Sequence, residues 1–236
     1  QLEYTINATD WNPANFLSGY QKSANAGNHW TVEWTNLPST DGSGITITGY
    51  RVVEFSGSGW VQIGEPKVIP DESTGTTTYY YTFTNSVTTS YSVEKRWNPS
   101  PAPTGASVTL ALYRTTEQNS VGSVDGQAVP VDELDSSKGA RTITLSDSTW
   151  SHTFTNLPKY DANGALYYYY ALELNGTTPI LQNGSITIDE TSYEVSYDWT
   201  TSRTQTTVTN TTATRLTGTK TWVDNDNAYH TRPQDL

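Results

Sequence analysis

Apolar and polar residues alternate with a period of two along much of this chain, as in exposed β-strands. The stretch YSVEKRWNP (91–99) is a clear case, because its even-numbered residues are polar and suit a solvent-facing side. The opposite face carries Tyr91, Val93, Lys95 and Trp97. The pattern therefore places one lysine in the middle of an otherwise apolar face.

A second lysine has the same setting near the C-terminus, in LTGTKTWVD (216–224), where Lys220 shares a face with Leu216 and Trp222. An ammonium group is costly to bury unless it is paired or neutralised. For either lysine alone, the ordinary explanation is a side chain that snorkels to water from a strand end. Their recurrence in one context calls for a common explanation.

The composition agrees with a β-protein. Of the 236 residues 12% are aromatic, including 16 tyrosines and 8 tryptophans, and only 16% are charged. Threonine and serine are abundant and turn residues recur, whereas long stretches of helix-forming residues are absent. We therefore predict an all-β fold.

The chain contains a repeat with a period of about 120 residues. The stretch WTVEWTNLPSTDGSG (30–44) is echoed by WSHTFTNLPKYDANG (150–164), and a tyrosine-rich predicted strand ending in glutamate follows each (45–54 and 165–173). A further strand ending in Thr-Asn then follows each copy. Each full set thus reads as lysine strand, TNLP hairpin, glutamate strand and asparagine strand.

The repeat predicts three segments. Residues 87–213 contain one complete set and form one domain, 1–86 form a domain that lacks its first strand, and 214–236 hold a lysine strand without its domain. The chain thus resembles one period of a tandem array, cut inside a domain. A missing strand leaves an open sheet edge, so we expect residues 214–236 to complete 1–86 in trans or to belong to the next repeat.

The alternation also places two other recurrent polar residues on core-facing sides. These are a glutamate, Glu54 or Glu173, and an asparagine, Asn85 or Asn210. Taken alone, a glutamate at a strand end or an asparagine before a turn is common and needs no special role. Together with the lysine they form a reactive set: burial favours a neutral, nucleophilic amine and a protonated acid, which can polarise a carboxamide. Held close together, the amine can displace ammonia and form an amide cross-link.

The KTW…RP and TNLPKYD-x-NG motifs, the Tyr-x3-Glu strand and the terminal VTNT resemble the CnaB-type domains of Gram-positive surface adhesins and pilins. The resemblance covers nearly the whole chain and implies tandem immunoglobulin-like β-sandwiches of the inverse type. It also implies a self-formed Lys–Asn isopeptide bond assisted by a buried acid. In the complete domain Lys95 would be the amine, Glu173 the acid and Asn210 the acceptor.

For the split domain, the resemblance implies that Glu54 is the acid and Asn85 the acceptor, with Lys220 of a neighbouring copy or repeat as the amine. The sequence departs from the family pattern at EKRWNPSPAPTG (94–105). The spacing from TNLP to the glutamate also differs by one residue, which a β-bulge at Gly49 would absorb. A Ser/Asp/Gly-rich insert between Tyr113 and Leu145 is expected to lie outside the sandwich.

Other functions find little support in the sequence. The net charge of −11 argues against a nucleic acid or an anionic membrane as partner, and no apolar run approaches the length of a membrane span. The three histidines lack metal-ligand spacing, and no phosphate loop, dinucleotide fingerprint or nucleophile elbow occurs. We expect no metal, no cofactor and no enzymatic turnover beyond a single self-cross-linking event.

The predicted function is that of a structural stalk or fibre repeat at a bacterial cell surface, extracellular and anchored to the cell wall through parts outside this chain. Its predicted partners are neighbouring copies or adjacent repeats, head to tail, together with an unidentified host or environmental ligand. The alternative is a ligand- or carbohydrate-binding adhesin module, with the insert (114–144) as the binding segment. A hydrolase accessory or catalytic domain is a weaker rival.

Overall fold

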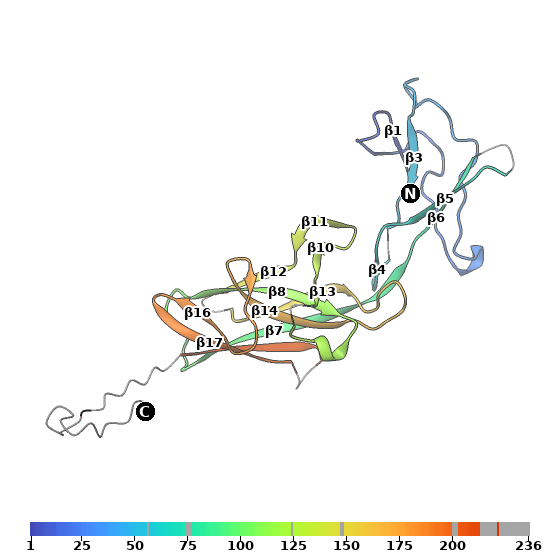
Figure 1. The fold of residues 1–236 in the computed structure, drawn as a ribbon. Coiled ribbons are helices and arrows are strands. Elements are labelled where there is room, and N and C mark those ends of the chain that lie inside the picture. The colour runs from blue at the N-terminus through green and yellow to red at the C-terminus, as the bar shows by residue number, and fades with distance from the viewer. Residues whose placement is uncertain are drawn as a thin grey trace, which may run out of the picture.

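The computed structural model describes residues 1–212, apart from 56, 74–76, 124, 147–148 and 200–202, together with residue 221. The regular structure of these residues is β, with two 3-10 turns, η1 (Ala26–Asn28) and η2 (Gln118–Ser120). The all-β prediction is confirmed. Two packed sheets form the centre of the molecule, and the N-terminal strands lie at one end (Figure 1).

The first sheet is built around the long strand that contains Lys95. Its order is β13 (Ser151–Pro158), β7 (Asn85–Asn98), β18 (Gln205–Thr212), β17 (Thr191–Asp198) and β16 (Gly184–Ile188). Strands β7 and β18 run parallel, and the other pairs are antiparallel. The short strand β4 (Trp60–Gln62) pairs with the beginning of β7. The lysine strand is therefore hydrogen-bonded along both of its edges.

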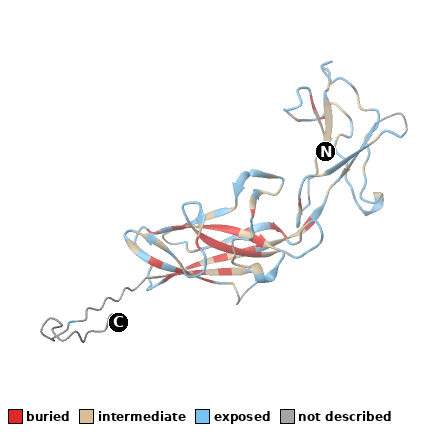
Figure 2. Ribbon diagram, in the orientation of Figure 1, coloured by how far each residue is buried: buried red, intermediate tan, exposed pale blue. Residues whose placement is uncertain are grey.

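The second sheet packs against the first and closes the sandwich. Its order is β12 (Thr142–Ser146), β8 (Ser107–Thr115), β14 (Tyr168–Asn175) and β15 (Thr178–Pro179), and β9 (Gln127–Ala128) pairs with β8. The apolar positions predicted from alternation fill the space between the sheets, where twenty buried apolar residues form one cluster. Figure 2 shows this buried layer within the sandwich.

The N-terminal segment has far less core. It contains β1 (Leu2–Thr5), which lies between β2 (Asn12–Pro13) and β3 (Gly49–Val52), and a separate pair of β5 (Lys67–Asp71) and β6 (Thr78–Thr82). Among its described residues the buried apolar side chains are Leu2, Ala14 and Ile63. Nine large apolar side chains are exposed: Ile6, Trp30, Ile45, Phe55, Trp60, Val68, Ile69, Tyr79 and Tyr80.

Two strands predicted in this segment differ from expectation. The first TNLP stretch does not form the expected strand before Pro38, and β6 ends at Thr82, so that Asn85 begins β7 instead of ending its own strand. In the sandwich formed by the later residues, the corresponding strands are β13 and β18, and they flank the lysine strand on either side. In the N-terminal segment the two counterparts have no such strand between them among the described residues.

The insert after Tyr113 is more integrated than predicted. Its hairpin, β10 (Pro130–Asp132) and β11 (Asp135–Ala140), projects from the sandwich, but Val129 is fully buried in the core. A buried ion pair between Arg114 and Glu133, at 2.8 Å, ties the hairpin to β8. The end of the predicted insert is β12, a strand of the second sheet, so the expectation that this whole segment lies outside the sandwich is wrong.

At the position expected for a bulge, Thr48 and Gly49 both lie opposite Thr5, because the backbone N–H of Thr48 also donates to Thr5 O at 2.8 Å. The ladder between β1 and β3 runs without a shift from Thr5↔Gly49 to Leu2↔Val52. Glu54 lies beyond the end of β3, whereas Glu173 lies within β14. Tyr50 and Tyr169 make the same hydrogen bond and each lies four residues before its glutamate, so the extra residue lies before Tyr50, where the bulge was expected.

Candidate cross-linking site

Three strands bring a lysine, a glutamate and an asparagine together between the sheets. Lys95 is on β7 and Asn210 on the parallel neighbour β18, and Glu173 faces them from β14 in the opposite sheet. The register pairs Lys95 with Val208 and Trp97 with Asn210, so Asn210 lies one inward-facing position beyond the lysine. These are the three residues that the sequence singled out for the complete domain.

The carboxylate of Glu173 contacts both of the other groups. Its Oε1 accepts a hydrogen bond of 2.9 Å from Nδ2 of Asn210, and its Oε2 lies 3.7 Å from Nζ of Lys95. Nζ of Lys95 also donates to the carbonyl oxygen of Arg96 at 3.0 Å. The acid is thus positioned between the amine and the carboxamide nitrogen.

All three side chains are shielded from water. Lys95 is 3% exposed, and Glu173 and Asn210 are 0% exposed. Burial lowers the pKa of Lys95 to about 8, although the charge of Glu173 opposes this shift. Burial likewise raises the pKa of Glu173, against the influence of Lys95 and of the hydrogen bond from Asn210. Both changes favour the uncharged forms, a nucleophilic amine and a carboxylic acid.

Two aromatic residues that the sequence did not single out complete the site. The hydroxyl of Tyr197 accepts a hydrogen bond from the backbone N–H of Glu173 at 3.1 Å and donates one to Ile180 O at 2.6 Å, which fixes the backbone that carries the acid. The ring centroid of Trp97 lies 4.4 Å from Nζ of Lys95. The spacing Lys-x-Trp, found at both lysines, is a sequence signal for Trp97; Tyr197 has no such signal.

A second acid–asparagine pair occurs at the end of the N-terminal segment. Nδ2 of Asn85 donates to Oε1 of Glu54 at 2.8 Å, which matches the contact between Asn210 and Glu173. Glu54 is half-buried and Asn85 is exposed. Lys220, the amine predicted for this pair, lies outside the described residues.

Further contacts recur at corresponding positions of the two segments. The hydroxyl of Tyr50 donates to Pro38 O and that of Tyr169 to Pro158 O, at 2.8 and 2.5 Å. Asn36 and Asn156 both adopt positive φ, 53° and 55°. The hairpin loops after them are each closed by an aspartate whose Oδ1 accepts two backbone N–H bonds. These turns therefore form in the same way in both segments.

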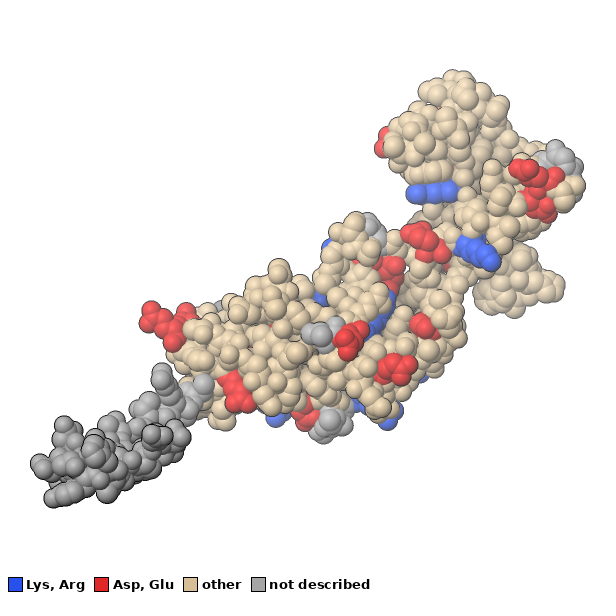
Figure 3. Space-filling model, viewed as in Figure 1, with Lys and Arg blue, Asp and Glu red and all other residues tan. Residues whose placement is uncertain are grey.

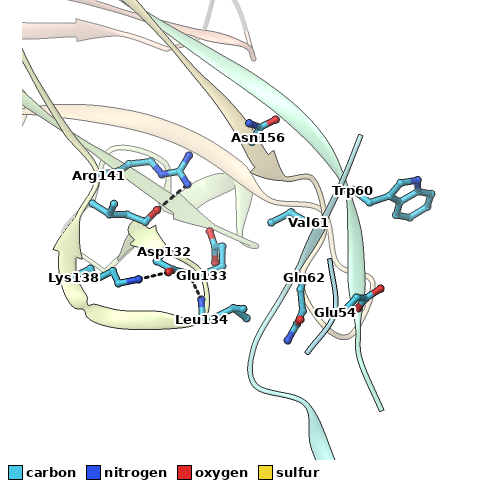
Figure 4. A pocket seen from close by; sticks show the side chains of 11 residues that line it. Glu54, Trp60, Val61, Gln62, Asp132, Glu133, Leu134, Lys138, Arg141 and Asn156 are labelled. Atoms are coloured by element: carbon cyan, nitrogen blue, oxygen red, sulfur yellow. Dashed lines mark hydrogen bonds and ion pairs between the residues drawn. The ribbon is translucent and has the colours of Figure 1, made fainter. Parts of the chain in front are cut away.

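The structure also has a surface cavity of about 420 Å³ between β4 and the β10–β11 hairpin. Its charged side chains make contacts within the protein: Lys138 pairs with Asp132 at 2.6 Å, Glu133 pairs with Arg114, Arg141 donates to backbone carbonyls, and Glu54 accepts a hydrogen bond from Asn85 through Oε1. Figure 4 shows the ring of Trp60 pointing away from the hairpin. We assign no chemistry to this cavity.

Other kinds of site find no structural support in the described part of the chain. No cluster of His, Asp or Glu suited to a metal ion occurs there, and no helix has the length and apolar character needed to cross a bilayer. Lysine and arginine side chains are scattered on the face seen in Figure 3, rather than gathered into a basic patch.

The fold and the site together define a two-sheet β-sandwich module with a buried lysine, glutamate and asparagine at its centre. The chain belongs to the family of Cna protein B-type domains, which matches residues 91–211. That span begins in β7 and ends in β18, so it includes all three residues. Membership of this family supports a structural module of a surface adhesin or pilus stalk, a class of protein without enzymatic turnover.

A solved structure with detectable similarity is the pilus adhesin SpaC from Lactobacillus rhamnosus GG. It aligns with 64% of this chain at 15% identity, with a TM-score of 0.35. The alignment spans 16% of the SpaC chain. No curated protein matches the sequence.

Proposed function

We propose that this chain is a stalk or fibre repeat of a Gram-positive cell-surface adhesin or pilus-like protein, stiffened by a self-formed isopeptide bond between Lys95 and Asn210. The observation that carries the proposal is the contact of one buried carboxyl group with both reacting nitrogens. The protein would lie outside the cell and be anchored to the wall through parts beyond this chain.

The bond would join the first and last strands of the sandwich, β7 and β18, which are adjacent and parallel. Tension applied to the two ends of such a domain acts on these strands. A covalent link between them would carry that load past the rest of the fold, which suits an extracellular tether. The reaction occurs once per molecule, so it is a maturation step rather than enzymatic turnover.

The proposal extends to the N-terminal segment. A lysine strand (216–222) from a neighbouring copy or repeat would enter between residues 30–38 and the strand that leads to Asn85. By the register of β7 and β18, Lys220 would pair with Phe83 and Trp222 with Asn85. Glu54 would then serve the new amine as Glu173 serves Lys95. Repeated head to tail, this contact makes a filament, because a heterologous interface does not close on itself.

The absent strand over residues 30–36, the early end of β6 and the exposed apolar side chains of the N-terminal segment support this extension. They are the features expected of a sandwich that awaits a strand. The acid and the acceptor are already hydrogen-bonded to one another there.

The test is the intact mass of the denatured protein. Each bond releases ammonia, so the mass should fall by about 17 Da for each amine that attacks a carboxamide. Lys95→Ala and Glu173→Gln should abolish the loss at the first site, whereas Lys159→Ala, which removes an exposed lysine, should retain it. An unchanged mass in the parent protein would refute the cross-link.

Assembly has a separate readout. A ladder of covalent multimers that disappears with Lys220→Ala or Asn85→Ala, but persists with Lys95→Ala, would support strand completion between copies. Monomers alone at high concentration, with the 17 Da loss retained, would restrict the proposal to the bond within residues 87–213.

A further inference from the structure

Buried polar atoms without a hydrogen-bond partner are concentrated at the two proposed reaction sites. Among the described side chains there are four such atoms: Glu54 Oε2, Trp97 Nε1, Glu173 Oε2 and Asn210 Oδ1. Buried polar groups in proteins are normally paired, so each exception calls for an explanation. Three of the four surround Lys95, and the fourth is on the matching acid of the N-terminal segment.

The contacts of Glu173 leave one reacting atom without support. The carboxyl group faces the leaving nitrogen, Nδ2 of Asn210, through Oε1, and it faces the attacking amine through Oε2. Neither of these contacts reaches the carbonyl oxygen of Asn210. That oxygen is where negative charge develops when an amine adds to a carboxamide, and a fixed donor at this position lowers the barrier.

Trp97 is the residue placed to supply that donor. It pairs directly with Asn210 across the parallel ladder, so the two side chains project from the same face as neighbours. Its indole N–H is buried without an acceptor, and its ring contacts Nζ of Lys95. Edge-on contacts with Trp150 and Tyr193, at 5.4 and 5.3 Å between ring centroids, hold the indole in place.

We propose that the indole N–H of Trp97 donates a hydrogen bond to Oδ1 of Asn210 as the amide bond forms, which makes it the oxyanion donor of the reaction. The inference rests on the proposed cross-link between Lys95 and Asn210. The proposal is carried by the unpaired donor of Trp97 and the unpaired acceptor of Asn210, on residues that are neighbours across the ladder.

The reaction balances with these groups alone. The lone pair of the neutral Lys95 Nζ bonds to Cγ of Asn210, and the carbonyl π electrons move to Oδ1, where the indole N–H of Trp97 stabilises them. Protonated Glu173 gives its proton to Nδ2 and takes one from Nζ. The C=O bond re-forms, the Cγ–Nδ2 bond breaks and ammonia leaves. Glu173 ends protonated as it began.

The test compares rates of ammonia loss in chains collected unfolded from inclusion bodies and diluted into folding buffer. Trp97→Phe keeps an aromatic ring but lacks the N–H, and it should slow the 17 Da loss about 100-fold, as removal of one oxyanion donor does. Trp60→Phe is the matched control, because it makes the same change in an exposed ring on β4, away from the site. It should react at close to the parental rate.

A second variant shows whether slow cross-linking comes from the lost N–H or from poorer packing. Benzothienylalanine at position 97 has the shape of tryptophan but carries sulfur in place of the N–H. Slow cross-linking in this folded variant supports the donor role. Cross-linking at the parental rate in this variant or in Trp97→Phe overturns the inference and leaves the proposed bond intact. Absence of the 17 Da loss in the parent protein overturns both.

Discussion

The two halves of this molecule contain the same local motifs but differ in their packing. In the second half the lysine strand β7 lies between β13 and β18, and a continuous core forms around it. In the first half the counterpart of β13 is irregular, the counterpart of β18 ends early, and nine large apolar side chains are exposed. The strands that fail to form are those that would flank a lysine strand.

The comparison separates what local sequence specifies from what a central strand provides. The Asp-closed hairpin loops, the Tyr–Pro hydrogen bond and the acid–asparagine contact form in both halves. Sheet edges, by contrast, need a partner for their backbone groups, since buried N–H and C=O groups must be paired. In the proposed assembly, one strand therefore determines whether the same motifs close into a sandwich.

The largest expected effect comes from removing the proposed cross-link of the complete half. Lys95→Ala should lower the free energy of unfolding by about 4–5 kcal/mol, because a covalent link that closes a loop of roughly 100 residues restricts the unfolded chain by that amount. Denaturant unfolding monitored by circular dichroism measures the change. The intact mass of the same sample shows whether the bond is absent.

Arg96→Ala is the control for this substitution. Arg96 is adjacent on β7 but faces water, where it pairs with Glu94 on the outer surface. It should leave both the mass loss and the unfolding midpoint unchanged. Equal effects of the two substitutions would mean that Lys95 contributes only as a strand residue.

A smaller effect is expected when the incomplete half is given its missing strand. A synthetic peptide of residues 214–224 should protect the backbone amides of 30–38 and 78–85 from hydrogen exchange, because it would pair with both segments. It should also add covalently, with a product about 17 Da lighter than the sum of the two components. Exchange followed by mass spectrometry reports both.

Asn85→Ala separates the two parts of this prediction. The variant should still gain protection with the peptide but form no covalent product. Protection confined to other segments, or none at all, would contradict strand completion at this edge.

The sequence predicted the all-β fold and the strands that carry Lys95, Glu173 and Asn210, because alternation and repetition are local signals. It predicted a strand over residues 30–36 that is absent, since alternation indicates which face is apolar but not whether a neighbouring strand exists. The partial docking of the insert was also missed. Val129 is one apolar residue in a polar segment, and its burial depends on contacts that no local pattern reveals.

The residues that orient the reacting groups could be predicted from the sequence only in part. Trp97 falls on the lysine face, but its pairing with Asn210 depends on a parallel register between strands more than a hundred residues apart. The hydrogen bonds of Tyr197 arise in the same way from tertiary packing. Sequence alternation therefore identified the reacting groups better than the residues that orient them.

The smallest expected effect is the pH dependence of cross-linking. Lys95 and Glu173 are buried, unlike the acid and asparagine of the incomplete half, and the pH dependence tests whether this burial controls the reaction. Lys95 and Glu173 share one proton in the reactive state, so the fraction with a neutral amine and a protonated acid is constant while the pair holds that proton. At lower pH a second proton charges the amine. At higher pH the acid has lost the proton that the leaving nitrogen needs.

The rate of ammonia loss on refolding should therefore be flat at intermediate pH and fall about tenfold per pH unit on either side. Because burial raises the pKa of Glu173 and lowers that of Lys95 to about 8, both limits move inward from the ordinary values of the two groups. The upper limit should lie near pH 8 and the lower one above pH 4.5. A rate that rises steadily to pH 10 would show an ordinary, solvated lysine, and the distinction between the two halves would then not extend to the chemistry of the site.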